Sequence, residues 1–488
     1  MKRAVSLILL LCLTLTFVAC ADSSDENQGN EAYETDTEGK STAFSTVRKE
    51  NYEGYEVNIL YISATEMDKD FVAETIDGSV LNDRVYERNA LVSTTYNVTL
   101  SLETMGSGDI ITLIRNTSLA GDSPYDFYGV QRSCIPLSYE GLLYDMATVK
   151  DIDLTQEWWD QNWVDTMTVK SSIYTLVGDI SPHTLQYASA LAFNKQLFDN
   201  YGLTYPYDLV REGKWTYDEY FKYISNATQD LNEDSKYDEN DFYGVVGWGT
   251  EASYSLFYGS GISFARVNKE GKLALGYDQE KLVNVYEKVY RMWITENNFI
   301  QMSTGGTDGL EKRSKVFSIF KGDRSLFLDT VLLQISTDIT DMESDYGIVP
   351  IPKYNEDQKN YCSYVGYVVP TIAMAINVSD ADKIGNIIEA CCTAAYDIIT
   401  PDMFEIITKL QDVRDLDSSE MVDKIIRTKF FDVAHWYMIT GYCDFPRVPL
   451  TNKTDDVVSY LRNYIKVSNK EIENINTAYE KLAQQNKS

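Results

Sequence analysis

Polar and apolar residues alternate over several short segments of the chain beyond residue 50. Within residues 55–62 the apolar positions recur at every second residue, beginning with Tyr55, Val57 and Ile59, which predicts a β-strand. Residues 81–93 place their apolar side chains at helical spacing instead. The same patterns predict two further strands and one further helix, over 97–103, 125–130 and 110–118. This order of strands and helices indicates a parallel sheet covered by helices.

A second round of alternation follows later in the chain. Thr216 and Glu219 have the spacing of a helix start, because each can satisfy an amide that the first turn leaves unpaired. The remaining segments are predicted as a helix over 192–201 and as strands over 243–248, 326–329, 346–351 and 365–376. Beyond these segments the pattern is mostly helical, so the chain is predicted to hold two sheets and a helical C-terminal region.

Open α/β sheets bind their ligands beyond the carboxyl ends of the strands. Ser63 follows the first predicted strand, and Gln131 and Arg132 follow the third. We therefore expect these side chains at the rim of a ligand site.

The N-terminus consists of Lys2 and Arg3, an apolar run too short to span a bilayer comfortably, and then Cys20. These features resemble a bacterial lipoprotein signal, with Phe17 where that pattern usually has leucine. The resemblance implies that residues 1–19 are removed and that a lipid is attached to Cys20. The protein is then tethered at the outer face of the cytoplasmic membrane. An ordinary secretory signal cleaved nearby, or a buried first helix, remains an alternative.

Residues 20–50 are rich in acidic, hydroxyl and amide side chains and nearly free of aliphatic ones. Such a segment cannot bury enough apolar area to offset the entropy of ordering, so we expect a disordered, lipid-anchored tether. The chain carries 43 Lys and Arg against 74 Asp and Glu, a net charge of −31. This charge disfavours nucleic acid and anionic lipid as partners, so contact with the membrane is expected through the anchor only.

The segment 230–241 has the ligand spacing of a calcium loop. Calcium prefers six to eight hard oxygen ligands on a flexible loop. Ser235 stands where an EF-hand loop has glycine, and Asp241 stands where it has glutamate, as in dockerin-type loops. The alternative is an acidic surface turn. The predicted structural Ca²⁺ ligands are Asp230, Asn232, Asp234, the Lys236 carbonyl, Asp238 and Asp241.

No catalytic motif is present: the chain has two histidines, His183 and His435, and no P-loop, HExxH, GxSxG or CxxC sequence. Aromatic residues are abundant instead, with 36 Tyr, 18 Phe and 7 Trp. Aromatic faces stack on sugar rings while polar neighbours bond the hydroxyls, although most of these rings are expected in the core. The candidate ligand-binding residues are Gln131, Arg132, Asp179, Trp248, Trp293, Tyr364 and Trp436.

Several segments together resemble family 1 extracellular solute-binding proteins, the capture components of ATP-driven (ABC) sugar importers. These segments occur in the order 158–160, 178–181, 194–203, 211–216, 241–244, 345–353 and 414–421. The resemblance implies a two-lobed, periplasmic-binding-protein-like (type II) α/β fold, each lobe a mainly parallel sheet flanked by helices. The implied lobes are 51–182 with 363–400, and 183–362, followed by a helical region over 401–488 that packs across them.

The resemblance further implies a monomeric, non-enzymatic protein that captures a carbohydrate, expected to be an oligosaccharide, and delivers it to an ABC permease. Two other functions fit the same residues. A surface-anchored glycoside hydrolase requires two close carboxylates, one with a raised pKa. A binder of peptides or polyamines requires several carboxylates that converge with aromatic rings.

Overall fold

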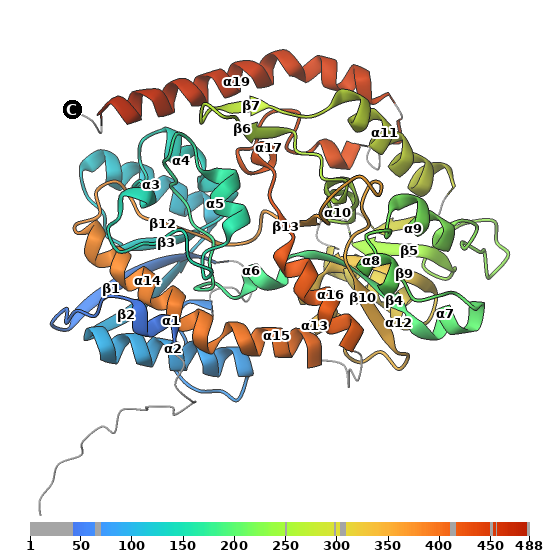
Figure 1. Cartoon of the computed structure of the whole chain (residues 1–488), viewed down its shortest axis with the longest axis horizontal. Helices are drawn as coiled ribbons and strands as arrows, with labels where there is room; N and C mark the ends of the chain where they lie inside the picture. The colour runs from blue at the N-terminus through green and yellow to red at the C-terminus, as the bar shows by residue number, and fades with distance from the viewer. Residues whose placement is uncertain are drawn as a thin grey trace, which may run out of the picture. The chain divides into compact units, whose positions relative to one another are not determined.

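The computed structural model describes residues 42–63, 70–248, 251–296, 299–302, 309–409, 416–448, 452–454 and 456–485. Within these residues, two sheets carry the core, each with its own set of helices (Figure 1). We call the parts built on them the first and the second lobe. None of the helices in these ranges has the length and apolar character needed to span a membrane.

The first sheet has the strand order β12-β3-β1-β2. Strand β1 pairs in parallel with β2 and β3, while β12 runs antiparallel to β3. The alternation that predicts a strand over 55–62 coincides with β1, which becomes buried on both faces toward its carboxyl end. The elements of this lobe are β1 (Tyr55–Ile62), α2 (Val80–Tyr96), β2 (Val98–Met105), α3 (Ser107–Ala120), β3 (Phe127–Val130), α4 (Pro136–Tyr139), α5 (Gln161–Met167), β12 (Thr371–Ala373) and α14 (Ala381–Ile398).

The second sheet has the order β10-β4-β9-β5-β8 and is mixed, which corrects the expectation of a mainly parallel sheet. Strand β4 runs antiparallel to both of its neighbours, while β5 runs parallel to β8 and β9. The strands and the helices that accompany them are β4 (Ser189–Asn194), α7 (Lys195–Tyr201), α8 (Tyr207–Arg211), α9 (Tyr217–Ile224), β5 (Tyr243–Trp248), α10 (Glu251–Gly259), α11 (Gln279–Tyr290), β8 (Phe299–Met302), α12 (Gly309–Lys321), β9 (Ser325–Val331), α13 (Leu332–Asp338) and β10 (Tyr346–Val349).

The helix predicted over 192–201 is wrong at its start, because residues through Asn194 belong to strand β4. All six residues of β4 are buried, so the strand has no exposed face and lacks the alternation that would reveal it. Asn194 then caps α7: its side-chain oxygen accepts a hydrogen bond from the Leu197 amide at 2.9 Å. By contrast, the helix start predicted at Thr216 is confirmed, with its hydroxyl accepting from the Glu219 amide.

The chain passes between the two sheets more than once. It leaves the first sheet after Leu176, which bridges to Ile372 of β12, and enters the second at Ser189 through the short helix α6 (His183–Gln186). On its return it forms β11 (Ser363–Tyr364), which pairs with β13 (Lys429–Phe430) from the C-terminal region. The strand predicted over 365–376 is therefore correct only for the three residues of β12.

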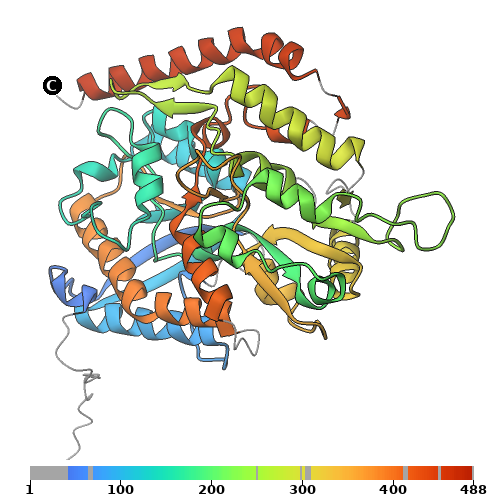
Figure 2. The same cartoon turned by 45° about the vertical axis from the view of Figure 1, so that its right-hand side comes forward.

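The C-terminal region contains α15 (Thr400–Lys409), α16 (Leu416–Arg427), α17 (Val433–Trp436) and the long helix α19 (Val457–Gln485). Helix α19 lies along both lobes (Figures 1 and 2), contacting α4 of the first lobe and α11 of the second. The hairpin of β6 (Ala265–Val267) and β7 (Leu273–Leu275) packs beneath it, and the Asn476 side chain bonds both the amide and the carbonyl of Leu273.

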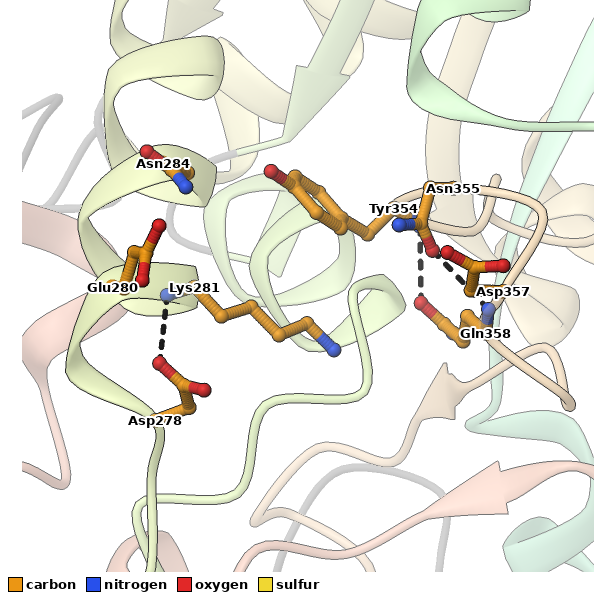
Figure 3. A pocket seen from close by; sticks show the side chains of 8 residues that line it. All are labelled: Asp278, Glu280, Lys281, Asn284, Tyr354, Asn355, Asp357 and Gln358. Carbon is orange, nitrogen blue, oxygen red and sulfur yellow. Dashed lines mark hydrogen bonds between the residues drawn. The ribbon is translucent and has the colours of Figure 1, made fainter.

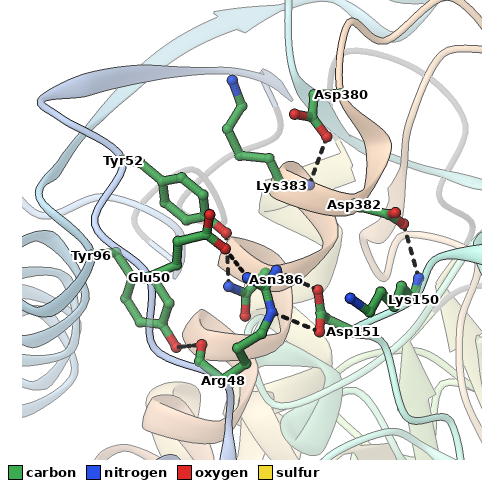
Figure 4. A network of polar contacts seen from close by, with 10 residues as sticks. All are labelled: Arg48, Glu50, Tyr52, Tyr96, Lys150, Asp151, Asp380, Asp382, Lys383 and Asn386. Carbon is green, nitrogen blue, oxygen red and sulfur yellow. Dashed lines mark hydrogen bonds and ion pairs between the residues drawn. The ribbon is translucent and has the colours of Figure 1, made fainter.

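The segment 42–50 is ordered, so the expectation of a disordered tether through residue 50 is wrong for these residues. Helix α1 (Ala43–Thr46) packs on α14, and the Asp397 carboxylate accepts hydrogen bonds from the Ala43 and Phe44 amides. Arg48 forms an ion pair with Glu50 and a two-nitrogen contact with Asp151 (Figure 4). The average composition of residues 20–50 does not reveal this packing, because a single buried side chain, Phe44, anchors an otherwise polar segment. Residues 1–41, including Cys20, lie outside the described residues.

Candidate functional site

The site is built where strand β3 ends in the first lobe. Gln131 and Arg132 follow β3 directly and open a short 3₁₀ turn (Arg132–Cys134). Both side chains are half-buried. The Gln131 side-chain nitrogen donates a hydrogen bond to the Val368 carbonyl at 2.8 Å, on the segment that returns from the second lobe. The end of β3 therefore meets the returning chain, as the rule for open sheets leads one to expect.

Arg132 reaches across to His435 of α17. Its Nη1 lies 3.1 Å from His435 Nε2, and His435 Nδ1 lies 2.8 Å from the Cys443 carbonyl. Because a carbonyl only accepts, the Nδ1 proton is the one donated to Cys443, and Nε2 is left to accept from Arg132 and from the Tyr364 hydroxyl at 3.0 Å. Burial, reinforced by the charge of Arg132, lowers the pKa of His435 to about 3. The imidazole is therefore neutral at physiological pH.

Aromatic rings from the second lobe and from the returning chain surround His435. The ring of Tyr364 stacks on Tyr254 and Tyr258 of α10, with centroids 5.3 and 5.1 Å apart. Tyr254 also packs edge-on against His435 and donates its hydroxyl proton to Asp444 at 2.8 Å. Tyr254, Tyr258, Tyr364 and His435 are each at most 2% exposed. This group forms the rigid base of the site, because buried, mutually packed rings have few alternative rotamers.

The partly exposed edge of the site carries charge. The Arg132 guanidinium lies over the ring of Tyr367, 3.9 Å from its centroid. Arg447 pairs with Asp444 at 3.0 Å, and its side chain is 41% exposed. The local arrangement therefore combines aromatic faces with guanidinium, carboxylate and amide groups, the mixture that binds and orients polar ligands.

Three of the seven candidate ligand residues, Gln131, Arg132 and Tyr364, lie at this site. Trp436 is close in sequence to His435, but it is fully buried and packs edge-on against Trp163 at 4.6 Å. Trp293 is 2% exposed in the core of the second lobe. Neither tryptophan presents a face to solvent in this structure. The Trp248 side chain lies outside the described residues, and Ser63, the other predicted rim residue, ends the described segment 42–63.

The sequence offered no signal for Tyr367, Asp444 and Arg447. The contact between Arg132 and His435 spans 303 residues of chain, and no local pattern reports on so distant a partner. Tyr254, Tyr258 and His435 stand out as aromatic or titratable residues, but their mutual contacts depend on how α10 and α17 meet.

Asp179 belongs to a different, buried cluster near the first crossing. Burial raises the pKa of Asp179 to about 7, and the Thr400 hydroxyl donates to it at 2.7 Å. Burial likewise raises the pKa of Glu389 to about 7, although the indole nitrogens of Trp158 and Trp159 donate to it at 2.8 and 2.9 Å. These carboxyls are 8% and 2% exposed, so they are sealed inside the protein.

The predicted calcium loop joins α9 to β5 and extends away from the second sheet (Figure 2). Ser235 has a φ of +64°, the left-handed conformation that an EF-hand loop needs at this position. Its amide donates to Asp230 Oδ2 at 2.8 Å, while Asp230 Oδ1 is buried without a partner in the described structure. Asp241 accepts from the Leu231 and Asp238 amides, both at 2.9 Å.

The other predicted ligands also bond the loop's own backbone: Asn232 accepts from the Asp234 amide, Asp234 accepts from the Lys236 amide, and Asp238 accepts from the Asn240 amide. Within the described ranges, no group of three or more Asp, Glu, His or Cys side chains is arranged to hold a metal ion. The calcium site therefore remains a prediction from the ligand spacing.

Calcium binding to this loop is tested by thermal unfolding of the full chain with calcium or with a chelator. A cation that binds only the folded state adds about 2.7 kcal/mol at one hundred times its Kd. We expect calcium to raise the melting temperature, and we expect Asp230→Asn with Asp241→Asn to abolish the increase. Glu270→Gln, at an exposed position outside the loop, should keep it. An equal increase in the loop variant and the control would contradict calcium at this loop.

The described surface has hollows away from the Arg132 site. One, of about 370 Å³, is lined by the start of α11 and the loop 354–358 (Figure 3). The Lys281 ammonium lies inside it and donates to the Ser260 carbonyl at 2.7 Å, and burial lowers its pKa. The second, of about 520 Å³, lies between β7 and α19. The side chains that line them do not include those of the Arg132 site.

No protein-family model matches the chain, and no curated protein sequence matches it. Solved structures do share its fold. An ABC substrate-binding protein from Listeria monocytogenes, in complex with cycloalternan, has a TM-score of 0.54 and 16% identity, covering 86% of this chain and 99% of its own. A cyclo/maltodextrin-binding protein complexed with maltotetraose has a TM-score of 0.54 and 15% identity, covering 86% and 97%.

A sugar transporter from Rhizobium etli, in an open conformation, has a TM-score of 0.53 and 15% identity, covering 88% of this chain and 99% of its own. At such identities the likeness establishes the fold. The expected two-lobed, periplasmic-binding-protein-like α/β fold is confirmed, with mixed sheets in place of mainly parallel ones.

Proposed function

We propose that the protein captures a carbohydrate between its two lobes and delivers it to the membrane permease of an ABC importer. The observation that carries this proposal is the shared fold: the similar proteins are matched over nearly their full length, and those named above bind or transport sugars. The site around Arg132 supports it, because residues from both lobes and from the returning chain meet there.

The side chains of the site suit a sugar ligand. Tyr367 offers an aromatic ring at a half-buried position, and Gln131 and Arg132 offer donors beside it. Aromatic rings pack on the C–H faces of sugars, while fixed donors and acceptors select the hydroxyls. A ligand that contacts both lobes favours the conformation in which those contacts coexist, so capture is coupled to closure of the lobes.

We extend the proposal to the cellular setting that the N-terminal sequence predicts. A lipid on Cys20 would hold the protein at the outer face of the cytoplasmic membrane, within reach of its permease. The net charge of −31 supports a soluble body that does not itself adhere to anionic lipid. We further propose an oligosaccharide as cargo, because two of the similar proteins named above are in complex with cycloalternan and with maltotetraose.

The arrangement of carboxylates argues against a glycoside hydrolase. Such an enzyme needs a raised-pKa carboxylic acid beside a second carboxylate, both in contact with substrate. The two carboxyls with pKa values raised to about 7, Asp179 and Glu389, are sealed in the core and bonded to Thr400, Trp158 and Trp159. A polyamine or cationic peptide is disfavoured as well, because the two aspartates of the site, Asp432 and Asp444, are already bonded by their neighbours and are matched by two arginines.

The proposal is tested by a thermal-shift screen of the full chain against saccharides, peptides and polyamines. A saccharide at about one hundred times its Kd should add about 2.7 kcal/mol of stability and raise the melting temperature. The incubation mixture is then analysed for products. Stabilisation by a saccharide that remains intact supports capture. Stabilisation by polyamines or peptides alone would contradict the proposed cargo, and turnover of a glycan would contradict the binding function.

A further inference from the structure

We propose that the captured saccharide carries an anionic group, a carboxylate or a sulfate ester, and that Arg132 binds this group. The inference rests on the proposed function and specifies its substrate class. It comes from the arrangement around Arg132, a cation with no carboxylate partner in the described part of an acidic chain.

Arg132 has no carboxylate partner among the described residues. Its contacts are the ring and backbone of His435 and the face of Tyr367. His435 is neutral, since its pKa is lowered to about 3, so it accepts a hydrogen bond without cancelling the charge. In a chain with 31 more acidic than basic side chains, a half-buried arginine without a carboxylate partner requires an explanation.

A purely structural role does not account for Arg132. Arg88 shows what such a role looks like: it is 1% exposed and donates to the backbone carbonyls of Asp70, Phe71 and Ile180. Arg132 is half-exposed instead and uses only Nη1 for hydrogen bonds. Its guanidinium is therefore held in place while its Nε and Nη2 donors have no hydrogen-bond partner in the described structure.

The unused edge of the guanidinium has the geometry of an anion receptor. Nε and Nη2 point along one edge of the planar group and have no hydrogen-bond partner in the described structure. On the other side of the guanidinium, Nη1 contacts His435 Nε2. The ring of Tyr367 packs against one face, with its centroid 3.9 Å from Arg132 Cζ. Two parallel N–H groups on a fixed plane match the two oxygens of a carboxylate or sulfate, which is why arginine favours such ligands.

Arg447 brings a second guanidinium to the site. Arg447 also lies close enough to His435 to lower its pKa, as Arg132 does. Asp444 offsets one of these charges, and it is already engaged by Arg447 and by the Tyr254 hydroxyl. Asp432 offsets the other charge, but it is fully buried and accepts hydrogen bonds from the His435 and Phe264 amides, so neither carboxylate contacts Arg132.

The test measures binding to the full chain by titration calorimetry with five oligosaccharides. The probes are trigalacturonic acid, the same trimer with its carboxyls reduced to alcohols, a chondroitin sulfate disaccharide, the same disaccharide without its sulfate, and maltotriose. The variants are Arg132→Gln, which removes the positive charge, and Arg132→Lys, which keeps the charge but lacks the two parallel N–H groups of the guanidinium. Arg115→Gln is the matched control, because Arg115 lies on α3 of the same lobe and pairs with Glu140.

We expect an acidic saccharide to bind at least about tenfold more tightly than its reduced form, and the difference to shrink as salt is added. Arg132→Gln should lower that affinity by about 10- to 100-fold, the range for a charge-assisted hydrogen bond, and Arg132→Lys should recover part of it. Arg115→Gln should change it little. Because the chondroitin sulfate probe also carries a uronate carboxylate, comparing it with the same disaccharide without its sulfate shows which of the two anionic groups is bound.

Equal affinity for the acidic trimer and its reduced form would overturn the inference, as would unchanged affinity in folded Arg132→Gln. Binding of maltotriose or the reduced trimer alone would overturn it while leaving sugar capture intact. If no probe and no neutral saccharide binds, the proposed function fails together with this inference. The melting temperature of each variant establishes that it is folded.

Discussion

Raising the pH from about 4 to about 7 is expected to remove several kcal/mol of stability that the protonated carboxyls of Asp179 and Glu389 contribute at low pH. Asp179 and Glu389 keep their protons in the folded chain up to about pH 7. In the unfolded chain they lose them near their ordinary values of 3.8 and 4.5. Between these limits the two carboxyls bind more protons in the folded state than in the unfolded state, so their contribution to stability falls as pH rises, by about 1.4 kcal/mol per pH unit for each group.

The surroundings of the two carboxyls give the physical reason. Asp179 lies near the buried ion pair of Asp160 and Lys429, in which the two charges are 2.5 Å apart. The positive charge of Lys429 lowers the pKa of Asp179, but burial and the charge of Asp160 raise it. For Glu389, burial outweighs the two indole donors, and the charge of Asp153 adds to the upward shift. Ionisation of either group places an uncompensated charge in the core.

The measurement is chemical unfolding at a series of pH values, for the natural chain and for Asp179→Asn with Glu389→Gln. The double variant has no proton to lose at these sites, so its stability at pH 7 relative to pH 4 should be higher than that of the natural chain by several kcal/mol. Asp208→Asn, at an exposed position, serves as the control and should keep the full slope. A double variant with the same slope as the natural chain would contradict the assignment.

Replacing Arg88 by methionine is expected to lower the free energy of unfolding by about 3–5 kcal/mol, because several buried carbonyls lose their donor. Arg88 joins the Asp70 and Phe71 carbonyls to the Ile180 carbonyl, with N···O distances of 3.0, 2.5 and 2.9 Å. The Ile180 carbonyl lies on the crossing between the lobes, so this one side chain ties the crossing to the first lobe. The substitution keeps the volume of the site roughly constant and removes the donors.

The matched control for Arg88 is Arg84→Met, one turn earlier on the same helix. Arg84 pairs with Glu87 and Asp402 at the surface, where its side chain is 40% exposed. Surface ion pairs contribute about 0–1 kcal/mol, so this substitution should cost much less. Urea unfolding of both variants measures the difference. Similar decreases in the free energy of unfolding for the two substitutions would show that the buried contacts of Arg88 do not stabilise the crossing between the lobes.

Where one face of a strand is polar, the sequence predicted the fold well. The strand predicted over 55–62 coincides with β1, whose first half alternates between exposed and buried positions. The strand predicted over 243–248 coincides with β5 because its valines and aromatic residues favour a strand, although residues 243–247 are buried. Strand β4 was missed because all six of its residues are buried, and its alanines and leucine also suit a helix. The direction of β4 was missed as well, since pairing between segments far apart in sequence leaves no local pattern.

The sequence predicted only those residues of the site whose position follows from the order of strands and helices along the chain. Gln131 and Arg132 were identified because they follow a strand, which is a property of the chain alone. Asp444 and Arg447 reach the same place through the packing of the C-terminal region, which no local pattern encodes. Trp293 and Trp436 were selected as stacking faces on residue type, but both are buried, as large aromatic side chains commonly are.

The central claim is that the protein binds a saccharide and leaves it unchanged. The most direct measurement is a calorimetric titration of the full chain with the saccharide that stabilises it most, followed by recovery and analysis of the ligand. The account predicts saturable binding of one saccharide per chain, weakened by Arg132→Gln, with the saccharide recovered intact. Recovery of cleaved saccharide in excess of the protein, or binding that Arg132→Gln leaves unchanged, would contradict the account.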